Sequence, residues 1–212
     1  MDRSDLAPRI DHTVVGPLTT PDDVATVLET ASEWDMNACI PPYAIAEFRD
    51  TSPDLTIMTV VGFPHGQHAP EIKRREAIAA VDDGADELDL VMNLGRLRAG
   101  DEQAARADLE AAIAAVEAPV KVIVEAPLLD AATLRRACEV AMNAGASMLK
   151  TSTGFADGGA TTEDVALMAE YGPVKASGGI RTYADALEML EAGAERIGSS
   201  TGDAVLEGAD PG

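Results

Sequence analysis

Eight short runs rich in valine, isoleucine and leucine recur along this chain, and a longer segment of helical periodicity separates most of them from the next. Short apolar runs that alternate with helical segments are typical of βα units, which build a parallel sheet. We therefore predict an α/β fold with eight parallel strands. The runs cover residues 10–13, 37–40, 56–61, 87–92, 120–125, 147–150, 174–176 and 196–198.

The segments between the runs carry the signals of helices packed on a sheet. In two of them, apolar residues recur three or four positions apart, which gives each helix one face to bury. The two stripes are Leu134, Ala137, Cys138, Ala141 and Met142, and Leu109, Ile113 and Val116. Three threonines stand three residues before an aspartate, the spacing of a capping box, and three glycines before later runs are expected to end the preceding helices. They are Thr20, Thr161 and Thr182, and Gly84, Gly145 and Gly193.

Eight such units suit a closed (β/α)8 barrel, and a chain of 212 residues lies near the short end of that fold's range of roughly 200 to 400. An open, doubly wound sheet is the alternative. The barrel is favoured because polar residues follow so many runs, and a barrel brings them to one mouth, where its active sites lie. No linker divides the chain, so we predict one domain over residues 1–212. The polar residues are Asp11, His12, Cys39, Asp89, Asn93, Glu125, Lys150, Lys175, Ser199 and Ser200.

The charge of the chain excludes several classes of partner. It has 37 acidic and 16 basic residues, for a formal net charge of -21. Nucleic acids and anionic membranes require a basic surface, so neither is an expected partner. Acidic residues spread over a chain with only four lysines also suggest a protein that works in concentrated salt, which screens self-repulsion.

The remaining composition indicates a cytoplasmic protein. Cys39 and Cys138 form neither a disulfide framework nor a metal-binding spacing, which fits a reducing compartment. The N-terminal residues lack the apolar segment of a signal peptide, and no run approaches the roughly 18 apolar residues that span a membrane.

Two lysines stand out because each ends an apolar run and is followed by small residues. Lys150 opens Lys-Thr-Ser-Thr-Gly, and Lys175 opens Lys-Ala-Ser-Gly-Gly. Burial disfavours the ammonium form, so a lysine in such a place can supply a neutral amine that attacks a carbonyl. A single lysine of this kind more often extends its charged end to solvent. Two copies, in a protein with four lysines, favour chemistry.

The loops after the last two runs are rich in glycine and hydroxyl groups. Residues 175–182 read Lys-Ala-Ser-Gly-Gly-Ile-Arg-Thr, and residues 198–202 read Gly-Ser-Ser-Thr-Gly. In barrel enzymes, the loops after strands seven and eight commonly bind phosphate through backbone N–H groups, and Arg181 would add charge. Either loop alone would be read as a tight turn with a helix cap. Together they predict a phosphorylated ligand.

Asp89 is a carboxylate inside an apolar run, which is unfavourable unless a cation or hydrogen bond compensates it. In a barrel it would point toward Lys150 and Lys175. A proton-transfer role and a purely counter-ionic role are equally compatible with its position. His65 and His68 lack a third metal ligand nearby and are read as solvated loop residues.

Three other residues receive a structural interpretation. Cys39 is expected to be a small buried residue. Lys73 and Lys121 are read as surface or structural charges.

With these residues in view, the chain resembles the deoxyribose-phosphate aldolases, a family of class I aldolases on a (β/α)8 barrel. The resemblance runs in order from Ile-Asp-His-Thr at residues 10–13 to the loop at 196–200, and the two lysine motifs carry it most specifically. Two features depart from some family members. Phe155 stands where they carry a lysine, and residues 210–212 have no counterpart to a tyrosine that enters their site.

The resemblance implies reversible cleavage of 2-deoxy-D-ribose 5-phosphate to acetaldehyde and D-glyceraldehyde 3-phosphate, without a cofactor or a metal. It makes Lys150 the Schiff-base residue, Lys175 the residue that tunes it, and Asp89 a proton carrier acting through a water. We also expect a homo-oligomer, a dimer or a tetramer. The expected substrate-binding residues are Asp11, Cys39, Thr151, Gly154, Gly178, Gly179, Arg181, Gly198, Ser199 and Ser200.

Two rival functions remain open from the residues themselves. A phosphosugar isomerase on the same barrel would use Asp89 as a general base and Lys150 as an electrostatic anchor. An acidic protein that binds phosphorylated metabolites or buffers cations would do no chemistry. Only the aldolase would acquire a covalent adduct when its substrate is reduced with borohydride.

Overall fold

A computed structural model describes residues 1–210 of the chain and contains one closed barrel of eight parallel strands. The strands follow one another around the barrel in sequence order, and β8 closes it by pairing with β1. The predicted barrel is therefore confirmed, and the open sheet is excluded. The strands are β1 Ile10–Thr13, β2 Asn37–Cys39, β3 Ile57–Val61, β4 Glu87–Val91, β5 Val120–Ile123, β6 Met148–Lys150, β7 Val174–Ser177 and β8 Arg196–Ser199.

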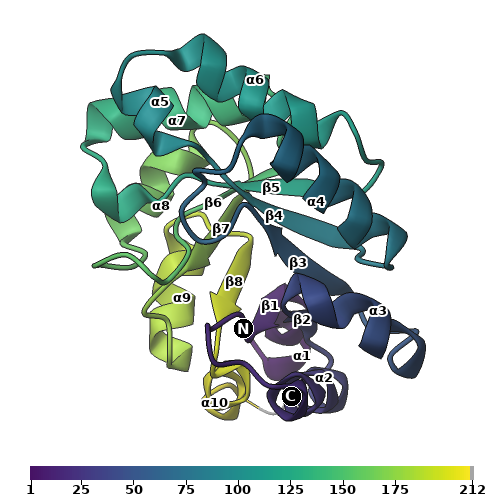
Figure 1. Cartoon of the computed structure of the whole chain (residues 1–212). Coiled ribbons are helices and arrows are strands. Elements are labelled where there is room, and N and C mark those ends of the chain that lie inside the picture. The colour runs from purple at the N-terminus through teal and green to yellow at the C-terminus, as the bar shows by residue number, and fades with distance from the viewer. Residues whose placement is uncertain (211–212) are drawn as a thin grey trace.

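Helices surround the strands on the outside of the barrel (Figure 1). Each of the eight predicted runs overlaps a strand whose ends fall within two residues of the prediction. The helices are α1 Arg3–Leu6, α2 Pro21–Glu33, α3 Ile45–Phe48, α4 Pro70–Asp82, α5 Leu94–Arg98, α6 Glu102–Ile113, α7 Ala131–Asn143, α8 Thr162–Ala169, α9 Tyr183–Glu191 and α10 Gly202–Glu207. Four short 3-10 turns lie between them, η1 Ala7–Arg9, η2 Pro42–Ala44, η3 Arg49–Thr51 and η4 Ala126–Leu128.

The predicted helix ends are largely as observed. Thr20 and Thr182 form complete capping boxes at the starts of α2 and α9. At the start of α8, Thr161 accepts the backbone N–H of Asp164, but the return bond of a box is absent. The three predicted helix-ending glycines all have positive φ, from 97 to 112°, a backbone conformation that glycine adopts without steric cost.

The main apolar core fills the space between the barrel and its helices. The face of α7 toward the barrel is apolar as predicted, with Leu134, Ala137, Cys138 and Ala141 buried. Leu109 of α6 is also buried, and Ile113 and Val116 pack against the same core. The inward side of the strands is different, because charged residues occupy much of it. This interior carries the candidate site.

Candidate active site

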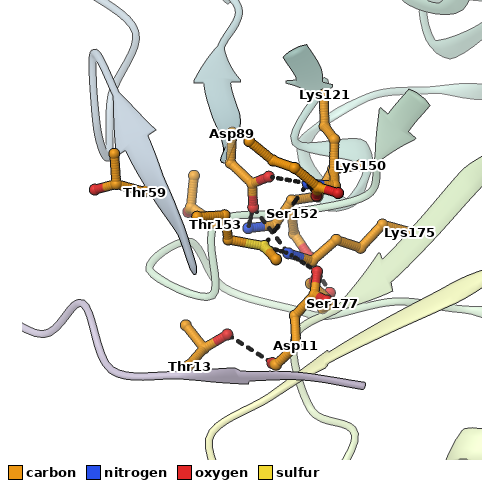
Figure 2. A network of polar contacts seen from close by, with 12 residues as sticks. Asp11, Thr13, Thr59, Asp89, Lys121, Lys150, Ser152, Thr153, Lys175 and Ser177 are labelled. Atoms are coloured by element: carbon orange, nitrogen blue, oxygen red, sulfur yellow. Dashed lines mark hydrogen bonds and ion pairs between the residues drawn. The ribbon is translucent and has the colours of Figure 1, made fainter. Parts of the chain in front are cut away.

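Three charged residues meet inside the barrel: Asp89 in the middle of β4, Lys150 at the end of β6 and Lys175 near the start of β7. Lys150 and Lys175 are register partners on neighbouring strands, so their side chains leave the sheet on the same face. Lys150 Nζ lies 2.7 Å from Asp89 Oδ2, and Lys175 Nζ lies 2.9 Å from the same oxygen. Figure 2 shows both lysines directed at Asp89. The prediction that Asp89 points inward and pairs with both lysines is confirmed.

Further ion pairs extend this group toward the opposite end of the barrel. Lys121 Nζ lies 3.3 Å from Asp89 Oδ1 and also pairs with Glu87. Arg196 bridges Glu87 and Asp11, with its NH1 nitrogen 2.7 Å from Glu87 Oε2. Asp11 Oδ2 in turn lies 2.6 Å from Lys175 Nζ. The interior network thus joins four cations to three carboxylates, a local excess of positive charge within an acidic protein.

The ion pairs of the network fix the charge states of Asp89, Asp11 and Lys175. Burial opposes ionisation of Asp89, yet Lys150, Lys175 and Lys121 hold the pKa of this carboxyl well below its usual range. Burial likewise opposes ionisation of Asp11, but Lys175 and Arg196 lower its pKa. Burial disfavours the Lys175 ammonium, and Asp11 and Asp89 overcome this and raise the Lys175 pKa. Lys175 is therefore a fixed ammonium flanked by two carboxylates.

The two lysines differ in their access to ligands. Lys175 is completely buried, whereas Lys150 is 4% exposed and lines a pocket of about 560 Å³. Lys150 has one carboxylate partner, Asp89, while Lys175 has two. Lys150 is thus the amine of this pair that a carbonyl compound can reach.

The pocket wall beyond Lys150 includes the two glycine-rich loops, together with residues 13–19 and 153–155. Gly154, Gly178 and Gly179 all have positive φ, and a Cβ added to Gly154 or Gly179 would meet no atom within 4 Å. The backbones of Gly154 and Gly179 are open to the pocket, as close approach by an anion requires. Seven of the ten predicted substrate-binding residues line the pocket: Gly154, Gly178, Gly179, Arg181, Gly198, Ser199 and Ser200.

Three other predicted substrate-binding residues lie elsewhere. Thr151 is buried, and its hydroxyl is engaged with the backbone of Ser177, donating to the carbonyl at 3.0 Å and accepting from the N–H at 2.9 Å. Asp11 is buried against Lys175 and Arg196 within the interior network. Cys39 is fully buried beside Met58 and Val60 as a small packed residue, and burial and then Asp89 raise its thiol pKa.

The expectation that every polar strand end faces one mouth needs correction. The His12 side chain lies outside the barrel, where its Nδ1 accepts the backbone N–H of Gly202 at 3.1 Å. Neighbouring residues of a strand alternate between faces, so Asp11 and His12 cannot both point inward. His65 and His68 are exposed, as predicted.

Lys73 and Lys121, read as surface or structural charges, are structural charges, because both are buried and ion-paired. Lys73 pairs with Asp108 at 2.6 Å between α4 and α6. Lys121 is the register partner of Asp89 and belongs to the interior network. Sequence reasoning also missed Glu87 and Arg196, which lie on inward positions of their strands. The period-two alternation within β4, counted from Asp89, marks Glu87 as inward.

The chain is also similar, over nearly its whole length, to a known protein family. A family model described as DeoC/LacD family aldolase matches residues 7–208. The chain belongs to this aldolase family. A deoxyribose-phosphate aldolase of Natronomonas pharaonis is 57% identical over 211 residues, covering 100% of this chain and 98% of that protein. One of Halobacterium salinarum is 56% identical over 203 residues, covering 95% and 96%.

Solved structures of aldolases have the same fold. A structure described as QR15, an aldolase, has a TM-score of 0.92 at 35% identity and covers 96% of this chain and 95% of its own. The tetrameric deoxyribose phosphate aldolase of Aeropyrum pernix has a TM-score of 0.88 at 35% identity, covering 97% and 91%. The chain is accordingly an aldolase, an enzyme of the lyase class.

Two features are absent from residues 1–210. No helix there is long and apolar enough to cross a bilayer. No group of three or more histidine, cysteine, aspartate or glutamate residues in that range is arranged to hold a metal ion.

Proposed function

We propose that this enzyme catalyses the reversible cleavage of 2-deoxy-D-ribose 5-phosphate to acetaldehyde and D-glyceraldehyde 3-phosphate through a Schiff base on Lys150. The observation that carries the proposal is the position of Lys150, an amine on the wall of a glycine-lined pocket beside a fixed ammonium and a fixed carboxylate. The names of the relatives, which are deoxyribose-phosphate aldolases, support the choice of substrate.

The reaction begins when the Lys150 amine adds to the C1 aldehyde, and loss of water leaves an iminium. Removal of the C3 hydroxyl proton lets the electrons of the C2–C3 bond move toward the iminium. C3 then becomes the aldehyde carbon of D-glyceraldehyde 3-phosphate, and an enamine of acetaldehyde remains on Lys150. Protonation of C2 and hydrolysis release acetaldehyde and restore the amine. The iminium serves as the electron sink, so we expect the reaction to need no metal or other cofactor.

Residues of the interior network and of the glycine-rich loops have the remaining catalytic and binding roles. Asp89, held as a carboxylate, carries the C3 proton through a water. Lys175 remains charged, orients Asp89 and tunes Lys150, because an ammonium repels a second positive charge beside it. The phosphate group binds the backbone N–H groups of the loops at residues 178–179 and 198–200, with Arg181 adding charge.

Borohydride reduction with the substrate present tests this proposal. A Schiff base is reduced to a stable secondary amine, and mass spectrometry of the digested protein then locates the modified residue. We expect one adduct, on Lys150, formed from acetaldehyde as well as from the phosphosugar. Turnover without an adduct would favour the isomerase, and the absence of both would favour a binding protein.

We further propose a cytoplasmic homo-oligomer, a dimer or a tetramer, formed by a single domain over residues 1–212. The tetramer of the Aeropyrum pernix enzyme supports an oligomer. Light scattering on the eluting peak of a size-exclusion column will measure the mass, to be compared with 22.0 kDa for one chain.

A further inference from the structure

One buried hydroxyl at the pocket wall has no partner. Within residues 1–210, four buried side-chain oxygens lack a hydrogen bond, and three of them belong to the carboxylates of ion-paired residues, Asp11, Asp89 and Asp108. The fourth is Ser177 Oγ, a neutral group in a residue that is 6% exposed. Leaving a buried hydroxyl unpaired is unfavourable, and few native groups do so without a reason.

The backbone of Ser177 is held firmly, although its hydroxyl is free. Its N–H donates to Thr151 Oγ1 at 2.9 Å, and its carbonyl accepts from Thr151 Oγ1 at 3.0 Å and from the Ser152 hydroxyl. Two hydroxyl side chains of the neighbouring segment thus position a residue whose own side chain contributes nothing to the fold's hydrogen bonding. Such pre-positioning is typical of groups that bind a ligand.

Ser177 lines the same pocket as Lys150 and the glycine-rich loops. Ser177 and Lys175 are two residues apart on β7 and share its inward face, with Ser177 nearer the mouth. A Cβ at Gly198 would lie 2.3 Å from Ser177 Oγ and 3.0 Å from Lys175 Cε, so the missing side chain at Gly198 leaves room for the hydroxyl. Beyond it come Gly178 and Gly179, and Lys150 lines the same pocket.

This position matches the middle of the proposed substrate. With C1 bound to Lys150, the C3 hydroxyl facing Asp89, and the phosphate on the glycine-rich loops, the C4 hydroxyl lies between these groups. We infer that Ser177 Oγ hydrogen-bonds the C4 hydroxyl, an inference that rests on the proposed function. This hydroxyl becomes the C2 hydroxyl of D-glyceraldehyde 3-phosphate. Ser177 is thus a specificity-determining residue that favours acceptor aldehydes with a hydroxyl beside the carbonyl.

The test compares two acceptors in the condensation direction, each with acetaldehyde as the donor. D-Glyceraldehyde 3-phosphate carries the hydroxyl, and 3-phosphooxypropanal lacks it. Ser177→Ala should lower kcat/KM for the first acceptor by about 10- to 100-fold, the usual effect of losing a hydrogen bond to a buried polar group. The same variant should leave kcat/KM for the second acceptor within about threefold. Equal losses for both acceptors, or no loss for either, would overturn the inference.

A matched variant separates binding from folding. Ser152→Ala removes a hydrogen bond to the Ser177 carbonyl and should lower the Tm while changing both acceptors alike. Ser177→Ala removes no such bond and should keep the wild-type Tm, and a clear fall in Tm would mean that the hydroxyl is structural.

Borohydride trapping with acetaldehyde tests the proposed function on which this inference rests. No adduct in the wild type defeats the proposed function, whereas an adduct on Lys150 with unselective Ser177→Ala kinetics defeats only this inference.

Discussion

Lys150 and Lys175 lie opposite each other on β6 and β7 and donate to the same oxygen of Asp89. The remaining partners of the two lysines are unequal. Lys175 also contacts Asp11 and is sealed from solvent, whereas Lys150 forms part of the pocket wall. One shared carboxylate thus holds two amines close together while only one of them can meet a substrate, which is the arrangement a Schiff-base enzyme needs.

Lys175→Leu should lower the rate of imine formation at pH 7 by about two orders of magnitude, the range typical of losing one acid–base or charge-tuning group. A neighbouring positive charge favours attack by a neutral amine, so loss of the Lys175 ammonium should slow the reaction at neutral pH, and part of the rate should return as the pH rises. The measurement is the rate of borohydride trapping from pH 6 to pH 10. A variant profile that overlays the wild-type profile would contradict this role for Lys175.

Lys150→Leu is the matched control, because it removes the neighbouring amine from the same shared carboxylate. It should abolish the adduct at every pH. Mass spectrometry decides the assignment directly. An adduct on Lys175 in the wild type would reverse the two roles.

Gly179→Asp should raise KM for 2-deoxyribose 5-phosphate by tenfold or more, an effect of about 1.4 kcal/mol, because it brings a carboxylate to the site of the phosphate. Space is available, since a Cβ there meets no atom within 4 Å, but φ is +83°. Gly179→Asn shares this backbone requirement without the charge, so it should raise KM less. KM for unphosphorylated deoxyribose should respond equally to both variants. Equal turnover of deoxyribose and its 5-phosphate by the wild type would contradict the proposed phosphate site.

Much of the fold could be predicted from the sequence because its signals are local. Alternation of short apolar runs with amphipathic segments gave the barrel, and the cap at Thr20 and the glycine at Gly84 gave helix ends. The two lysines could also be found, because each stands in an unusual local context. Their shared contact with Asp89 followed from the barrel topology.

The rest of the interior network depends on information that no single run contains. Lys121 joins it only because β5 pairs with β4 in the register that sets Lys121 beside Asp89. Arg196 reaches Asp11 on the neighbouring strand β1 and Glu87 across the barrel on β4, at sequence separations of 185 and 109 residues. Thr151 shows the converse case. Its place in a lysine motif suggested ligand binding, but its hydroxyl is engaged with the backbone of β7.

Stability should rise with salt concentration. The chain has a formal net charge of -21, and in dilute buffer at about 0.01 M ionic strength its charges repel over about 30 Å, the scale of the whole barrel. At 1 M salt this distance falls to about 3 Å, and the repulsion is largely screened. Tm measured from dilute buffer to molar KCl should therefore increase. A flat or falling curve would argue against a salt-adapted surface.

Breaking the buried pair of Lys73 and Asp108 should be strongly destabilising. Lys73 Nζ lies 2.6 Å from Asp108 and donates to the carbonyl of Val91 at 2.8 Å, and both charged side chains are almost fully buried. Lys73→Met leaves an uncompensated buried carboxylate and should cost about 3–5 kcal/mol of unfolding free energy. Urea denaturation measures this cost.

The double variant Lys73→Met/Asp108→Leu removes both charges and should recover most of that loss, because a hydrophobic pair avoids the desolvation of two ions. If the double variant is less stable than Lys73→Met alone, the ion pair is not the source of the effect.

His12 should make stability depend on pH below neutrality. Burial lowers the His12 pKa below its ordinary value, although the nearby Asp203 carboxylate opposes this, and the ring accepts the Gly202 N–H through an unprotonated Nδ1. The unfolded chain therefore binds a proton more readily than the folded chain. The stability from this residue is complete above an unfolded pKa of about 6.5 and is lost as pH falls through the lower folded value.

His12→Asn tests this because its amide oxygen can accept the same N–H but takes up no proton in this range. The carboxylates that titrate are common to both proteins, so their effect cancels in the comparison. The fall in Tm between pH 7.5 and pH 5 should be smaller for His12→Asn than for the wild type, with similar Tm values at pH 7.5. His12→Leu, which removes the acceptor, should lower Tm at both pH values. Parallel curves for the wild type and His12→Asn would show that His12 is not the titrating group.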